Sequence, residues 1–143
     1  MRFRLALLFL SLFTFISCGK LAELPTDPGL GGGPIDPTAT FTRVKNEVFT
    51  PSCTPFGCHG TIGPQEQLIL TSDRAYALIV NVRSNQNPSL FRVAPGDPAN
   101  SYLYRKITGS GITGDRMPQT GGFLNDAKIS LVRDWIRRGA PND

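Results

Sequence analysis

Two cysteines and the only histidine of the sequence stand together in the segment Cys53-Thr-Pro-Phe-Gly-Cys58-His59. Two thiols followed directly by a histidine are typical of covalent c-type haem attachment, in which the sulfurs bond the two haem vinyl groups. The histidine is then held beneath the iron as its proximal ligand. Four residues separate the two cysteines here, instead of the usual two, so the loop must bulge to bring both sulfurs to the porphyrin edge. Pro55 and Gly57 permit such a turn.

The same residues allow other interpretations. A Cys53–Cys58 disulfide would close a short surface loop and leave His59 without a role, and disulfides are common in exported chains. A structural zinc ion needs four ligands, whereas this segment supplies three Cys and His side chains. A Cys58–His59 catalytic pair is disfavoured because adjacent side chains diverge along a helix or a strand. Haem attachment is the preferred hypothesis, and the disulfide stays open beside it.

The second candidate ligand is Met117, the only methionine after the initiator. A thioether is the usual sixth ligand of an electron-transfer haem c, where the Met/His pair raises the reduction potential. Pro118 stiffens the residue that follows, and glycines on both sides leave the backbone free to approach a flat porphyrin face. The alternative is that this lone methionine fills a gap in the core. The cysteine and histidine segment upstream favours the ligand.

Residues 1–17 have the pattern of a lipoprotein-type signal peptide. Two arginines precede an apolar run, Leu5 to Ile16, that is too short to span a bilayer. Residues 15–19, Phe-Ile-Ser-Cys-Gly, resemble a bacterial lipobox, in which the cysteine becomes the acylated first residue. We therefore expect an exported protein, anchored by lipid on Cys18 at the periplasmic or cell-surface side of a membrane. The alternatives are ordinary cleavage and an uncleaved anchor.

Composition divides the rest of the chain into a tether and one domain. Residues 18–38 are rich in Pro and Gly, and about twenty such residues give a reach on the order of 25 Å. Residues 39–143 have the length of one domain. The net charge of +4 falls to about +2 when the two arginines of the signal peptide leave. This charge is too small to argue for nucleic-acid binding, so no nucleic-acid partner is expected.

Apolar periodicity predicts a mainly α domain with long loops around one cofactor. The predicted helices are residues 40–49, 72–80, 97–106 and 125–138. Pro51 is expected to end the first helix, Asp97 to cap the third and Asn125 to cap the last. Residues 68–70 are apolar enough for one short strand.

The order of these parts resembles the class I cytochrome c domain. More closely, it is similar to the cytochrome-c-like domains of exported planctomycete and myxobacterial lipoproteins, with a variant C-x-x-x-x-C-H haem motif. The resembling segments are residues 48–53, 57–60, 92–98, 101–103, 116–118 and 135–140. The resemblance implies thioether bonds at Cys53 and Cys58, with His59 and Met117 as axial ligands of the iron. It also places Arg92 near a haem propionate, with an exposed loop position as the alternative.

The resemblance implies an electron carrier with one covalently attached haem c per chain. Such a protein passes single electrons between redox partner proteins outside the cytosol and is not an enzyme, because His59 and Met117 fill both axial positions. Two alternatives stay open. Dissociation of Met117 would give a haem peroxidase or gas sensor, and a Cys53–Cys58 disulfide would give a haem-free lipoprotein module.

Overall fold

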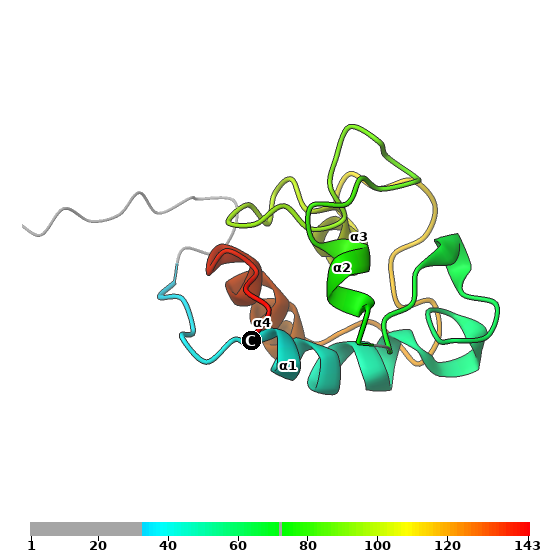
Figure 1. The fold of residues 1–143 in the computed structure, drawn as a ribbon, viewed down its shortest axis with the longest axis horizontal. Coiled ribbons are helices and arrows are strands. Elements are labelled where there is room, and N and C mark those ends of the chain that lie inside the picture. The colour runs from blue at the N-terminus through cyan, green and yellow to red at the C-terminus, as the bar shows by residue number, and fades with distance from the viewer. Residues whose placement is uncertain (1–32, 72) are drawn as a thin grey trace, which may run out of the picture.

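The computed structural model describes residues 33–71 and 73–143, and this part of the chain is mainly helical, without extended strands (Figure 1). This result confirms the predicted mainly α class. The predicted signal peptide, Cys18 and residues 18–32 of the predicted tether lie outside the described residues. The helical segments are α1 (Phe41–Arg43), η1 (Val44–Cys53), η2 (Pro55–Gly57), η3 (Gln65–Gln67), α2 (Ala75–Ile79), α3 (Tyr102–Thr108) and α4 (Asp126–Arg137).

The first helix is longer than the sequence predicts. It begins after Thr40, whose hydroxyl oxygen accepts a hydrogen bond from the Arg43 amide at 3.1 Å, and α1 passes directly into η1. The expectation that Pro51 ends this helix is wrong, because Pro51 lies inside η1, which consists of wider π-helical turns. A proline ring clashes with the carbonyl four residues before it, and a wider turn moves that carbonyl aside. The helix therefore extends to Cys53 and fixes its position.

The hydrophobic core is built from α4 and the α1–η1 helix, which pack against each other (Figure 1), and from residues of α2, α3 and the loops between them. Asn125 caps α4 as predicted, since its side chain accepts a hydrogen bond from the Lys128 amide at 3.0 Å. Trp135 of α4 is fully buried, and its ring centroid lies 5.4 Å from that of Phe41. The apolar stripe of α4 therefore packs on the helix that ends at Cys53.

The middle of the chain differs from prediction in two places. Asp97 does not cap α3, which begins at Tyr102; its carboxylate accepts a hydrogen bond from the Asn100 amide at 3.1 Å and closes a turn before the helix. The strand predicted at residues 68–70 is also wrong, because the structure has no strand there. The Leu70 amide instead donates to the His59 carbonyl at 2.8 Å, so this segment folds back against the histidine.

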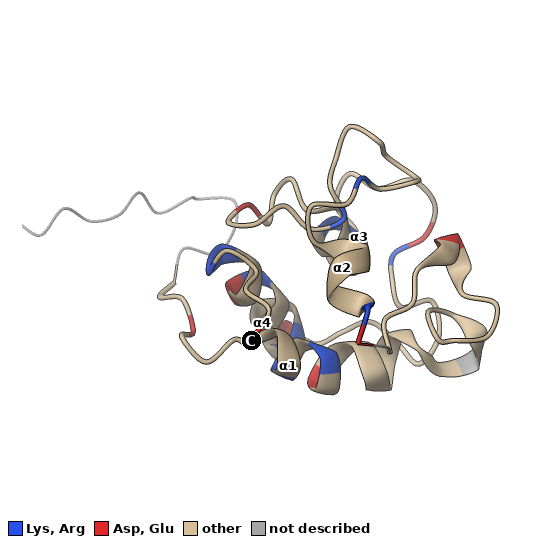
Figure 2. Ribbon diagram, in the orientation of Figure 1, with Lys and Arg blue, Asp and Glu red and all other residues tan. Residues whose placement is uncertain are grey.

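Charged residues of both signs are interspersed along the α1–η1 helix and along α4 (Figure 2). The Asp134 carboxylate is buried, and it accepts hydrogen bonds from the Arg133 side chain at 2.9 Å and from the Asp36 amide at 3.3 Å. The last residues of the predicted tether therefore contact α4. Within residues 33–71 and 73–143, no helix is long and apolar enough to cross a membrane.

Candidate cofactor site

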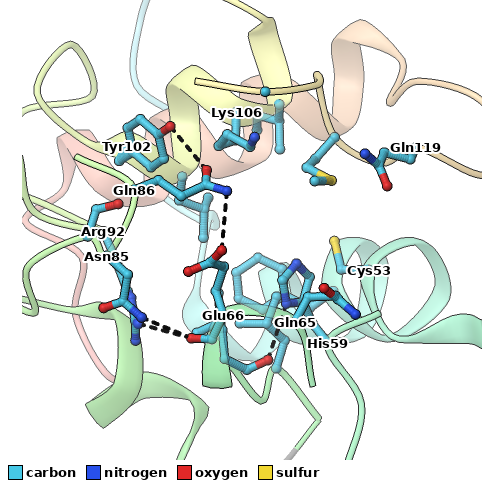
Figure 3. A pocket seen from close by; sticks show the side chains of 18 of the residues that line it. Cys53, His59, Gln65, Glu66, Asn85, Gln86, Arg92, Tyr102, Lys106 and Gln119 are labelled. Atoms are coloured by element: carbon cyan, nitrogen blue, oxygen red, sulfur yellow. Dashed lines mark hydrogen bonds between the residues drawn. The ribbon is translucent and has the colours of Figure 1, made fainter. Parts of the chain in front are cut away.

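A cavity of about 310 Å³ lies between η1, the segment that follows His59, α3 and the loop that carries Met117 (Figure 3). This volume falls in the range of small-molecule sites. Four of the predicted site residues line it: Cys53, His59, Arg92 and Met117. Cys58 is not among the lining residues. The cavity also has apolar walls, formed by Val48, Phe49, Leu68, Leu70, Leu103, Ile107 and Val132.

Cys53 brings a protonated thiol to the cavity. Its Sγ lies 3.8 Å from the Val48 carbonyl oxygen, and Figure 3 shows the sulfur beside His59 at one side of the pocket. Burial raises the pKa of Cys53 to about 12, and Lys128 opposes this rise only in part. Neither Cys53 nor Cys58 is disulfide-bonded in the structure. Cys53 is therefore available as a neutral thiol.

This burial predicts slow alkylation of Cys53 in the folded, haem-free protein. The thiolate is the reacting form, and at about pH 8 its fraction is roughly a thousandfold smaller for a pKa of about 12 than for the ordinary cysteine pKa of 9.0. The higher intrinsic nucleophilicity of a basic thiolate restores part of that loss, so labelling by iodoacetamide should be one to two orders of magnitude slower than for an unfolded cysteine. Peptide mass spectrometry after timed labelling measures this rate, with urea-unfolded protein as control. Equal rates for the folded and unfolded protein would contradict the buried position.

His59 has the orientation of a metal-ligating histidine. Its Nδ1 lies 3.2 Å from the Leu68 carbonyl oxygen, and since a carbonyl only accepts, Nδ1 carries the proton and Nε2 keeps its lone pair. Burial lowers the pKa of His59, which favours the neutral imidazole that binds metals. The His59 amide also donates to the Cys53 carbonyl at 3.0 Å. The imidazole and the Cys53 thiol are therefore held on one side of the cavity.

The Met117 segment is anchored to the end of α3. The Met117 amide donates to the Lys106 carbonyl at 2.8 Å, and Arg116 Nε donates to the Ile107 carbonyl at 2.8 Å. The Arg116 guanidinium also lies 4.4 Å from the centre of the Phe123 ring. Gly109 has a φ of +83°, a backbone conformation that favours glycine, and a Cβ there would lie 3.0 Å from Arg116 Cδ, so a larger residue would be strained and would displace the Arg116 side chain. The sequence marks Met117 as a candidate ligand but gives no sign that Arg116 anchors its segment.

The side of the cavity opposite Cys53 is polar (Figure 3). Arg92 is half-buried, and its guanidinium donates to the Leu78 carbonyl at 2.8 Å and to the Glu66 carbonyl at 3.4 Å. Burial lowers the pKa of Arg92 below its ordinary value. The Glu66 carboxylate also lines this edge, together with three polar side chains that were not predicted as site residues: Asn85, Gln86 and Tyr102. They come from loops and from the start of α3, where no local pattern marks a cavity.

The arrangement combines apolar walls, a polar edge and two candidate metal ligands. Apolar walls enclose the middle of the cavity, Arg92 provides a cation at the polar edge, and His59 and Met117 provide one nitrogen and one sulfur ligand. The described residues contain no group of three or more His, Cys, Asp or Glu side chains able to hold a metal ion.

Comparison of the chain with protein-family profiles, with curated proteins and with solved structures finds no match in any of the three.

Proposed function

We propose that this protein is a lipid-anchored, extracytoplasmic c-type cytochrome that carries single electrons between redox partner proteins through one covalently attached haem. The cavity that collects Cys53, His59 and Met117 is the observation that carries this proposal. Cys18 would bear the lipid, and His59 and Met117 would hold the haem iron. Bound haem supplies a one-electron iron couple.

The residues around the cavity have distinct roles in this proposal. His59 presents Nε2, because its Nδ1–H is engaged by the Leu68 carbonyl. The thioether of Met117 raises the reduction potential, and the apolar walls add to this effect by excluding water. Arg92 compensates the negative charge of a propionate at the polar edge. Because His59 and Met117 would both hold the iron, no position on it would remain for a substrate, so we propose a carrier and not an enzyme.

Haem attachment at Cys53 and attachment at Cys58 rest on different observations. Cys53 lines the cavity, and attachment there is supported by its position. Attachment at Cys58 rests on the motif alone, since this cysteine lies outside the cavity lining. Its carbonyl accepts a hydrogen bond from the Gln65 amide at 2.7 Å, which fixes the backbone of the loop next to His59.

Mass spectrometry of denatured protein, purified from a host that exports and assembles c-type cytochromes, tests the proposal. We expect the mass of the processed chain plus one haem, and a haem-stained band on a denaturing gel. Cys53→Ser and Cys58→Ser should each weaken attachment, while Ser52→Ala, next to Cys53, should leave it unchanged. A mass equal to the chain less the hydrogens of one disulfide would overturn the proposal in favour of the haem-free module.

A further inference from the structure

The loop between α3 and α4, residues 109–125, places Met117 at the cavity without any helix of its own. Five of its residues are glycines with positive φ: Gly109, Gly111, Gly114, Gly121 and Gly122. Glycine-rich backbone loses more conformational entropy on ordering than other sequences. The position of Met117 therefore depends on the few hydrogen bonds that tie this loop to the rest of the domain.

Two side chains of α3 hold the loop at Thr113, four residues before Met117. The Thr113 amide donates to the Tyr102 hydroxyl oxygen at 3.1 Å, and the Thr113 carbonyl accepts from Lys106 Nζ at 3.1 Å. Tyr102 and Lys106 are four residues apart and thus lie on the same face of the helix. Both backbone groups of Thr113 are therefore bonded to neighbouring side chains of one helix.

The Tyr102 hydroxyl continues this connection along the polar edge of the cavity (Figure 3). It donates to Gln86 Oε1 at 3.1 Å, and Gln86 Nε2 donates to Glu66 Oε1 at 3.4 Å. The phenol thus uses its single hydrogen on Gln86 and a lone pair on Thr113. Tyr102 is only 5% exposed, whereas Gln86 is half-buried and Thr113 is exposed. The chain of bonds joins the Met117 loop to the segment that follows His59.

We propose that Tyr102 is a positioning residue for Met117, acting through Thr113. This inference rests on the proposed function, since Met117 matters here as the sixth ligand of haem iron. Removal of the Tyr102 hydroxyl leaves the Thr113 amide and the Gln86 carbonyl without this partner, a loss that favours the open form of the loop. Met117 would then be held less firmly at the proposed haem site, and an added ligand would compete with it more successfully.

Tyr102→Phe in the full, haem-loaded chain tests the inference, with carbon monoxide as the probe. We expect the affinity of the reduced protein for carbon monoxide to rise about fivefold, the change that follows from the loss of one hydrogen bond. The near-infrared band of methionine-ligated ferric haem should weaken in parallel. Tyr104→Phe is the matched control, because Tyr104 lies on the same helix but its hydroxyl takes no part in the bonds to Thr113 and Gln86. It should leave both measurements unchanged.

A second measurement needs no haem. Hydrogen exchange at the Thr113 amide should become about fivefold faster in Tyr102→Phe and stay unchanged in Tyr104→Phe. Haem-loaded variants with equal carbon monoxide affinities would overturn this inference and leave the proposed function intact. A purified protein whose mass includes no haem would overturn the proposed function, and with it the role of Tyr102 toward Met117, even where the Thr113 exchange rate changes.

Discussion

Met117→Ala should abolish the near-infrared band of the oxidised protein, lower its reduction potential and open the iron to carbon monoxide and peroxide. The thioether is the proposed sixth ligand, and methionine ligation raises the potential of haem c. Haem should nonetheless remain in place, because Cys53 and His59, which line the cavity, would still hold it in the proposed site. Visible and near-infrared spectra, potentiometric titration and carbon monoxide binding measure the three effects.

Gln119→Ala is the matched control for this variant. Gln119 also lines the cavity from the same loop, but its amide donates to the Asp115 carboxylate at 2.8 Å and its side chain is not a usual haem ligand. We expect its spectrum and potential to match those of the unmodified protein. Should Met117→Ala behave like Gln119→Ala, Met117 is a core residue that fills a gap. Ready binding of carbon monoxide by the unmodified protein would favour the peroxidase or gas sensor instead.

A helix could be predicted from the sequence where its capping residue and its apolar periodicity indicate the same element. In α4, an Asn cap and an apolar stripe at helical spacing specify the element, and the structure places both as predicted. At Pro51 the local signal is misleading, because the penalty of a proline inside a helix is avoided by wider turns that no sequence pattern marks. The Asp97 carboxylate accepts a hydrogen bond from the amide three residues later and closes a turn instead of capping a helix. A helix cap uses the same hydrogen bond, so the sequence does not distinguish the two.

The candidate site was predictable where one residue type carries the chemistry. A thiol, an imidazole and a thioether are rare enough that Cys53, His59 and Met117 stand out without any structure, and all three line the cavity. Tyr102 and Gln86 are ordinary polar residues, and Thr113 takes part through its backbone. Their hydrogen bonds form only because the 84–86 loop, α3 and the loop after α3 lie together in the folded domain. That arrangement depends on contacts between residues distant in sequence, which no local pattern predicts. Cys58 is the opposite case: the sequence motif predicts it as a site residue, but it does not line the cavity.

Trp135→Ala should destabilise the domain strongly, lowering the free energy of unfolding by about 4 kcal/mol. The Trp135 ring is fully buried against Phe41, and its Nε1–H donates to the Pro141 carbonyl at 2.9 Å. The substitution creates a large cavity and removes that hydrogen bond. Trp135→Phe should cost less, because a ring still fills much of the space. Urea unfolding followed by circular dichroism gives the free energies of unfolding.

Ile62→Ala is the control for Trp135→Ala, because Ile62 is also large and apolar but is 86% exposed. It tests whether the loss of stability comes from removing a buried side chain and not from removing any apolar side chain. We expect a change of no more than about 0.5 kcal/mol for this surface position. Equal losses for Ile62→Ala and Trp135→Ala would show that α4 does not pack on the α1–η1 helix as described. Because Val132 of α4 and Phe49 of η1 both line the cavity, a loosened contact between these helices would also reach the cofactor site. The haem spectrum of folded Trp135→Phe should therefore broaden, while that of Ile62→Ala should remain unchanged.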